Sequence, residues 1–202
     1  MKDRAEQIMD IDLTTYMETE MTAHAEAFAA TRETIRDPFS DLLQACVESI
    51  RAGGKIIFFG NGGSAADAQH LATELTVRYI KDRPPIAAIA LTTDTSSLTA
   101  IGNDLGFDDL FARQVEALAM AGDVVIGIST SGNSENVIRA LNMAKKKGAT
   151  AAGFSGRDGG RMQGFAEPLV NVPWQETARI QEMHILIGHM LCGALEKELG
   201  LS

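Results

Sequence analysis

The chain has 202 residues, of which 45% are hydrophobic, and its formal net charge is −9. This length accommodates one well-buried α/β domain, and the acidic balance disfavours a nucleic acid or an anionic membrane as partner, because both require a basic surface. The charged N-terminus lacks the apolar core of a secretory signal, and no stretch has the roughly 20 apolar residues of a membrane helix. With Cys46 and Cys192 expected to be buried thiols, we predict a cytoplasmic protein.

Two helices are predicted before the first strand. Residues 7–36 place apolar residues near helical spacing between polar ones, and a second helix is predicted from Pro38 to Arg51, ending at a glycine pair. Because no strand precedes them, we expect the N-terminal helices, within residues 1–53, to be used in oligomerisation. The alternative is a first helix that folds back on its own domain.

From Lys55 onward, short apolar runs alternate with helical segments. Strands are predicted at 55–59, 86–91, 123–128, 149–154 and 168–172, and helices at 63–79, 108–120, 134–147 and 176–199. Near-continuous apolar strands separated by helices are typical of a parallel sheet covered on both faces. Right-handed crossovers then give an α/β fold, a three-layer αβα sandwich with a five-stranded, doubly wound sheet. We expect residues 54–202 to form this unit and the whole chain to be effectively one domain.

A serine-rich turn follows the third predicted strand and opens a helix. It reads Ser129-Thr130-Ser131-Gly132-Asn133-Ser134. Hydroxyls, free backbone amides and a helix N-terminus together favour an anion. The turn has no lysine, so it does not match the nucleotide P-loop, and a phosphomonoester fits better than a triphosphate. The alternative is an ordinary serine N-cap, which needs only one hydroxyl.

A glycine-rich turn, Gly60-Asn61-Gly62-Gly63-Ser64, follows the first predicted strand. Its glycines let the backbone approach a ligand closely. The same turn fits a loose dinucleotide-binding fingerprint, but that fingerprint requires an acidic residue about 20 residues further on, at the end of the second strand. The acid that follows the second strand here, Asp94, lies well beyond that distance. We therefore favour a sugar phosphate over a dinucleotide.

Two predicted helices carry side chains capable of chemistry. His70 and Glu74 are four residues apart, share a helix face and can bind a common ligand or metal ion, although a solvated face is the usual alternative. In the last helix, Gln181 and His184 are three apart and share a face, whereas His189 lies on another. Spacing alone does not decide which of these histidines is functional.

Together these motifs resemble the phosphoheptose isomerase family of sugar isomerase (SIS) domain enzymes. The resemblance runs nearly end to end and rests on the glycine turn, the His70–Glu74 pair, Gly102-Asn103-Asp104, the serine turn and Arg179-Ile180-Gln181-Glu182. It implies conversion of D-sedoheptulose 7-phosphate to D-glycero-D-manno-heptose 7-phosphate, the first step of activated heptose biosynthesis for surface polysaccharide such as lipopolysaccharide. It also implies a homotetramer with active sites between subunits and one zinc ion per subunit.

Carried over position by position, the resemblance assigns three sets of residues. The metal set is His70, Glu74, Gln181 and His189, which selects His189 over His184. The phosphate set is Ser129, Thr130, Ser131 and Ser134. The sugar is lined by Asn61, Gly62, Gly63, Asn103 and Asp104, the last two expected in a turn, with Glu74 and Gln181 also at the substrate. Some members have aspartate where this chain has Ala178, which leaves the metal set intact.

The implied reaction moves a proton between C1 and C2 through an enediol. Glu74 is the expected carboxylate base and His189 the group that passes or returns a proton. Zinc would polarise the carbonyl group.

Two alternatives remain open at this point. One is a non-enzymatic adaptor of the same fold that binds the bacterial replication initiator, which residues 64–66 and 178–184 also resemble. That adaptor lacks the metal-site acid and the last-helix histidine, whereas this chain has Glu74 and His189. The other is an isomerase or binder of another sugar phosphate, such as a hexose phosphate.

Overall fold

A computed structural model describes residues 11–201, so the charged N-terminus and the first residues of the helix predicted at 7–36 lie outside the described residues. The core is a single sheet with the strand order β2-β1-β3-β4-β5, in which every neighbouring pair is parallel. Its strands are β1 (Ile56–Gly60), β2 (Ala88–Ala90), β3 (Val124–Ser129), β4 (Thr150–Gly156) and β5 (Leu169–Val172). The predicted five-stranded, doubly wound parallel sheet is confirmed.

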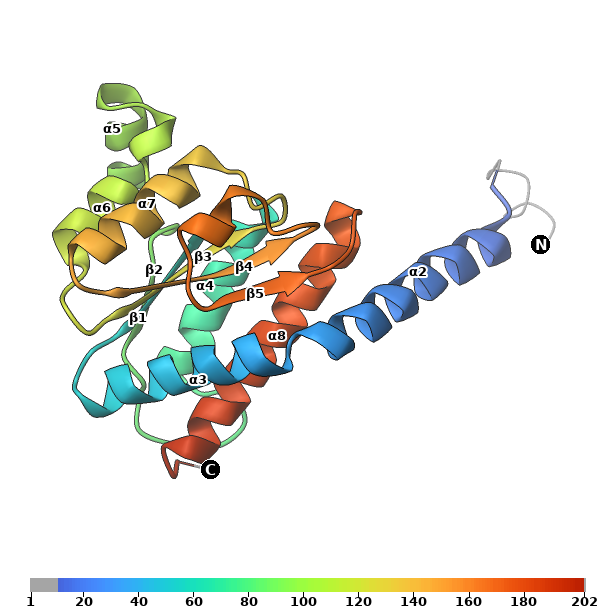
Figure 1. The fold of residues 1–202 in the computed structure, drawn as a ribbon, viewed down its shortest axis with the longest axis horizontal. Coiled ribbons are helices and arrows are strands. Elements are labelled where there is room, and N and C mark those ends of the chain that lie inside the picture. Colours follow the sequence, from blue (N-terminus) through green and yellow to red (C-terminus); the bar gives the residue numbers. More distant parts are fainter. Residues whose placement is uncertain (1–10, 202) are drawn as a thin grey trace, which may run out of the picture.

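Helices cover both faces of the sheet, as Figure 1 shows. One face is covered by α3 (Arg36–Arg51), α4 (Gly63–Thr76) and α8 (Thr177–Glu198), and the other by α5 (Thr95–Asp104), α6 (Ala112–Leu118) and α7 (Glu135–Lys146). Successive strand side chains point to opposite faces, so Phe58 packs in the first layer and Phe59 in the second. The strands read as continuous apolar runs because both of their faces are buried.

The strand order reverses between β1 and β3. These two strands pair from Ile56 opposite Val124 to Gly60 opposite Ile128, while β2 extends the sheet on one side and β4 and β5 extend it on the other. In open doubly wound sheets the ligand binds beyond the carboxyl ends of the strands at such a switch point. The glycine turn leaves β1 and the serine turn leaves β3 at this place.

The first described helix, α2 (Leu13–Thr34), runs away from the body of the molecule (Figure 1). It separates from α3 at Ile35 rather than at Pro38, since proline is tolerated in the first turn of a helix. Arg179 of α8 donates to the carbonyl oxygen of Glu20 at 2.7 Å and pairs with its carboxylate at 3.2 Å. Part of α2 therefore packs on its own chain, while a stripe of large apolar side chains stays exposed: Tyr16, Met17, Met21 and Phe28.

Helix α5 was not predicted, and the expectation of a turn at Asn103-Asp104 is wrong, because these residues form the end of this helix. Only Ile101 of α5 is buried. A helix with so little buried surface needs few apolar residues, and its sequence therefore lacks the apolar periodicity by which a helix is predicted. Its start is stabilised by Asp94, whose carboxylate accepts hydrogen bonds from the Ser97 backbone at 3.0 Å and the Ser97 hydroxyl at 2.7 Å.

Two observations bear on the expected compartment. Cys46 and Cys192 are both buried and free, as predicted, and burial raises the pKa of both thiols, that of Cys192 to about 12. None of the helices described between residues 11 and 201 is long and apolar enough to cross a membrane. The cytoplasmic location itself stays a prediction.

Candidate active site

The serine turn gathers three hydroxyls at the N-terminus of α7. The Oγ of Ser129 lies 2.9 Å from that of Ser134 and 3.4 Å from that of Ser131. Ser134 occupies the N-cap position, yet within the described chain its side chain makes no capping hydrogen bond. The ordinary-cap alternative is therefore wrong for this residue. Rotatable hydroxyls beside a helix N-terminus form a site suited to an anion.

The loop after β4 holds the serine turn in place from outside. The backbone N–H of Met162 donates to the Gly132 carbonyl at 2.9 Å, and that of Arg161 donates to Asn133 Oδ1 at 3.0 Å. Gly132 has a φ of 64°, and a Cβ there would collide with the carbonyl of Gly159. Both its conformation and this close approach require glycine, and the two hydrogen bonds tie the serine turn to the loop after β4.

The glycine turn is tied to the serine turn by two asparagines. Asn61 and Asn136 exchange two side-chain hydrogen bonds, of 2.9 and 2.8 Å. Asn61 directly follows β1, whereas Asn136 is 2% exposed and lies in the first turn of α7. Sequence reasoning missed Asn136, whose only sign is an amide two residues after Ser134.

Helices α4 and α8 run side by side in the same direction. Gln181 lies against the start of α4, because a Cβ on Gly63 would collide with its amide, and Gly188 lies against Leu71 further along. A glycine at each contact lets the two helices approach closely. Side chains at matching levels of α4 and α8 therefore meet.

This arrangement brings together His70, Glu74 and His189. The Nε2 atoms of the two histidines are 2.8 Å apart, and His70 Nε2 lies 3.6 Å from Glu74 Oε1. Tyr79 stacks on the His189 ring with a centroid distance of 5.5 Å. At the contact between the imidazoles one ring N–H donates to a ring nitrogen of the other.

Asp67 neighbours both Gln181 and His70. Its Oδ2 is buried and has no hydrogen-bond partner among the described residues. Burial raises the pKa of Asp67, while the Gln181 side chain and the nearby His70 act in the opposite direction. Asp67 was absent from the predicted sets, although it lies one helical turn before His70 on the same helix.

His184 lies in the core instead. It is fully buried, and its Nε2 is 2.9 Å from the Ser155 carbonyl oxygen. Because a carbonyl only accepts, Nε2 carries the proton and donates it. Burial lowers the pKa of His184 from its ordinary value of 6.5 to about 4, partly offset by this hydrogen bond. Pairing Gln181 with His184 by spacing therefore does not describe a shared site, and His189 is the histidine that lies against His70.

The clustered side chains suit zinc by their chemistry. Imidazole nitrogens and carboxylate oxygens are zinc ligands, and at bond lengths of about 2.0–2.1 Å two ligands of a tetrahedral ion lie about 3.3 Å apart. The 3.6 Å between His70 and Glu74 is close to this, and the 2.8 Å between the imidazoles would have to widen by about 0.5 Å. Across residues 11–201, no three His, Cys, Asp or Glu side chains are arranged so that they could hold a metal ion as they stand. By chemistry His70, Glu74 and His189 suit zinc after small side-chain movements, whereas the fourth predicted ligand, Gln181, lies against Gly63 at the start of α4.

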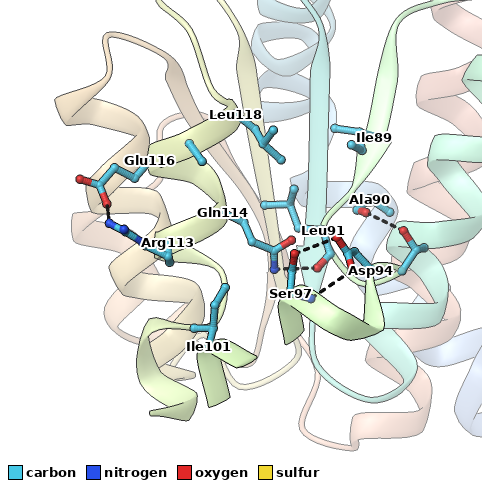
Figure 2. Close-up of a pocket in the computed structure, with 12 residues that line it drawn as sticks. Ile89, Ala90, Leu91, Asp94, Ser97, Ile101, Arg113, Gln114, Glu116 and Leu118 are labelled. Atoms are coloured by element: carbon cyan, nitrogen blue, oxygen red, sulfur yellow. Dashed lines mark hydrogen bonds and ion pairs between the residues drawn. The ribbon is translucent and has the colours of Figure 1, made fainter. Parts of the chain in front are cut away.

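Asn103 and Asp104 lie apart from this cluster. They are exposed on α5, on the opposite face of the sheet from α4 and α8, and Asn103 Nδ2 donates to Asp104 Oδ1 at 2.7 Å. A cavity of about 590 Å³ lies beside β2, α5 and α6, and Figure 2 shows residues that line it. Its lining contains none of the predicted site residues, and the amide of its Gln114 is already bonded to the Leu91 and Leu110 carbonyls. This cavity is separate from the candidate active site.

Comparison with known proteins identifies the family. The SIS domain family model matches residues 21–156. A phosphoheptose isomerase from Paramagnetospirillum magneticum is 59% identical over 182 residues, which cover 90% of this chain and 95% of that protein. The chain belongs to the phosphoheptose isomerase family. Another member, from Aquifex aeolicus, is 54% identical over 173 residues, covering 86% of this chain and 91% of its own.

Solved structures of phosphoheptose isomerases have the same fold. The Neisseria gonorrhoeae enzyme matches with a TM-score of 0.85 at 43% identity, covering 92% of this chain and 99% of its own. The Francisella tularensis enzyme matches with a TM-score of 0.88 at 33% identity, covering 93% and 100%. Membership of the phosphoheptose isomerase family confirms the prediction of a sugar-phosphate isomerase.

We expect Asn136→Ala to loosen the junction between the two turns, because it removes both hydrogen bonds to Asn61. Loss of two hydrogen bonds, each worth about 0.5–1.5 kcal/mol, lowers the free energy of unfolding by about 1–3 kcal/mol, and KM for the sugar phosphate rises up to about tenfold. Urea unfolding and steady-state kinetics measure the two effects. Asn142→Ala, at an exposed position of the same helix, should change stability by less than about 0.5 kcal/mol. An unchanged KM in a destabilised Asn136→Ala protein would contradict the coupling.

We expect His184 to make stability depend on pH. Below its ordinary pKa the unfolded chain binds a proton at His184, whereas the folded chain stays neutral there down to about pH 4. Stability therefore falls as the pH drops from about 6.5 to 4, by up to about 3 kcal/mol. When urea unfolding is measured at several pH values, the free energy of unfolding should change less steeply with pH for His184→Leu than for the wild-type protein. The core variant Leu191→Ala, which removes no titratable group, should keep the wild-type slope; equal slopes in all three proteins would refute this assignment.

Proposed function

We propose that the protein isomerises D-sedoheptulose 7-phosphate to D-glycero-D-manno-heptose 7-phosphate, the first step of activated heptose biosynthesis for surface polysaccharide. The observation that carries the proposal is the contact of His70 with both Glu74 and His189 across α4 and α8. An aldose–ketose interchange requires a positioned acid and a positioned base, and Glu74 and His189 are residue types that can fill these two roles. Relatives named phosphoheptose isomerase, up to 59% identical, support the choice of substrate.

The serine turn is the proposed phosphate site. Convergent hydroxyls at the start of α7 support this role for Ser129, Thr130, Ser131 and Ser134. The glycine turn is the proposed sugar site: Gly62 and Gly63 are both exposed, and at Gly62, where nothing occupies the place of a side chain, the backbone is open to hydroxyl groups of the sugar. Asn61 completes this turn and is held in place by Asn136.

The reaction needs proton transfers at two carbons and two oxygens. Glu74 takes a proton from C1 of the ketose, which forms the enediol, and returns it to C2. His189 gives a proton to O2 as the enediol forms and takes one from O1 as the aldehyde forms. The negative charge that develops on oxygen must be stabilised in the transition state. His70, which contacts both groups, would hold them close to each other.

We also propose one zinc ion per subunit, held by His70, Glu74, Gln181 and His189. When bound, zinc would supply a Lewis acid that polarises the carbonyl oxygen. Because Glu74 is also the proposed base, its carboxylate must be free of other bonds when it takes the proton.

A homotetramer with active sites between subunits is part of the proposal. The exposed stripe of α2 and an adjoining apolar groove support it, since apolar patches of this kind mark interaction surfaces. The groove is lined mainly by Phe28, Ile35, Phe39, Leu186 and Met190. A site shared between subunits would also account for the place of Asn103 and Asp104 in the sugar set, because a second copy can present α5 to the site.

We expect Glu74→Gln to lose turnover while the fold survives. The amide cannot accept the C1 proton, so kcat falls by about 10²–10⁴-fold. In D₂O, NMR measures loss of the C1 proton of sedoheptulose 7-phosphate directly. Glu116→Gln, at an exposed glutamate on α6, should exchange at the wild-type rate. Near-wild-type exchange by Glu74→Gln would sink the assignment of the base.

An assay that identifies the products distinguishes the alternative functions. Purified protein is incubated with sedoheptulose 7-phosphate or fructose 6-phosphate, with zinc or with a chelator, and the products are identified. We expect an aldoheptose product that disappears with the chelator and returns with zinc. A faster reaction of the hexose phosphate would favour another sugar-phosphate isomerase. No product under any metal condition would favour the adaptor.

We expect the apolar stripe of α2 to hold the assembly together. Met17→Glu and Met21→Glu place charges where side chains are now 52% and 65% exposed, and they should shift the protein to a smaller species in sedimentation velocity, because burying an unpaired charge costs several kcal/mol. Thr19→Glu, on the opposite face of the helix, should leave the assembly intact. An unchanged sedimentation coefficient in both methionine variants would exclude this face.

A further inference from the structure

Arg83 and Glu196 form a buried ion pair behind the proposed reacting end. Arg83 Nε lies 2.8 Å from Glu196 Oε1, and the two side chains are 1% and 2% exposed. Arg83 belongs to the segment between α4 and β2, and Glu196 to the end of α8. Replacing such a pair by apolar residues of similar volume is often neutral or stabilising. Stability alone therefore does not explain why charges occupy this place.

The guanidinium group of Arg83 fixes the end of α4. It donates to the carbonyl oxygens of Leu75 at 2.8 Å, Pro84 at 3.0 Å and Glu74 at 2.8 Å. Carbonyls in the last turn of a helix lack partners within the helix, and a cation there is favoured by the helix dipole. The backbone of Glu74, the proposed base, is thereby held from behind.

The carboxylate of Glu196 extends the same framework to His189. Its Oε1 also accepts a hydrogen bond from the backbone N–H of Tyr79 at 3.1 Å. The Tyr79 ring stacks on His189 at an interplanar angle of 23°. The ring also covers Gly193, where a Cβ would come within 3.2 Å of Tyr79 Cε1. Two contacts thus lead from Glu196 to the proposed acid.

We propose that Arg83 and Glu196 are positioning residues that set the distance between Glu74 and His189. This inference rests on the proposed function, because it concerns the two groups that exchange protons there. A displacement of about 1 Å at reacting groups can cost about 10²-fold in rate. The Arg83–Glu196 pair is hydrogen-bonded to the backbone of Glu74 and to that of Tyr79, whose ring stacks on His189. Both proposed reacting groups are therefore restrained relative to the same ion pair.

The double variant Arg83→Met/Glu196→Leu tests this role. It removes both charges together but leaves the Glu74 carbonyl and the Tyr79 N–H without these partners. We expect kcat for sedoheptulose 7-phosphate to fall about 10- to 100-fold, and the zinc affinity, measured by chelator competition, to fall about tenfold. The inhibition constant of inorganic phosphate should change less than about threefold, because the serine turn lies on other elements.

Three further variants separate positioning from stability. Leu42→Ala removes a fully buried side chain of α3; it should lose stability yet keep kcat at temperatures where it is folded. Arg51→Met removes a guanidinium that also donates to α8, at the Glu198 carbonyl, and should keep kcat. Glu196→Gln keeps an oxygen that can accept from Arg83 and Tyr79; it should be less stable but retain kcat within about threefold.

Several results would overturn the inference. A folded double variant with wild-type kcat would do so, as would a Glu196→Gln variant that loses as much kcat as the double variant. If kcat and the affinity for inorganic phosphate fell by the same factor in the double variant, the ion pair would have a general structural role. If the double variant does not fold, Tyr79→Leu decides: an unchanged kcat overturns the inference, and a loss of about tenfold supports it. Failure of the wild-type protein to convert the heptulose phosphate would instead refute the proposed function.

Discussion

The pairing of β1 with β3 is the constraint on which the candidate site depends. The register from Ile56–Val124 to Gly60–Ile128 brings the ends of two strands together although β2 and several helices separate them in sequence. Because the strand order reverses here, α4 and α7 leave toward opposite faces and their N-termini meet at one edge. The exchange of hydrogen bonds between Asn61 and Asn136 closes this junction. A slip in register would separate the glycine turn from the serine turn.

The second determinant is the close approach of α4 and α8. Gly63 faces the Gln181 amide and Gly188 faces Leu71, and a side chain at either glycine would push the helices apart. The contact between His70 and the last helix depends on this spacing. The proposed chemistry is therefore a property of two helices packed side by side, and neither helix specifies it alone.

This explains which parts of the structure could be predicted from sequence. The sheet could be predicted because burial on both faces leaves a continuous apolar run in each strand. The gathering of hydroxyls in the serine turn could be predicted because they are neighbours in sequence, and their role in binding phosphate stays a proposal. Spacing could not choose between His184 and His189, because the partner of each is set by another element: Ser155 for the first and His70 for the second. Asn136 was missed for the same reason, since its partner is 75 residues away.

A net charge of −9 and a phosphate ligand are compatible because the serine turn relies on neutral donors. The cations near the turn are engaged with carboxylates: Arg139 and Arg161 bind Glu135 at 2.9 and 2.8 Å. Their hydrogen bonds hold the pKa of Glu135 below its usual range, so this carboxylate, the first residue of α7, is ionised but paired. Hydroxyls, backbone amides and the helix dipole remain for the phosphate, and such donors discriminate by direction more than by charge. A turn of this kind suits any phosphomonoester, so in the proposed function the reaction is specified at the other end of the sugar, where α4 meets α8.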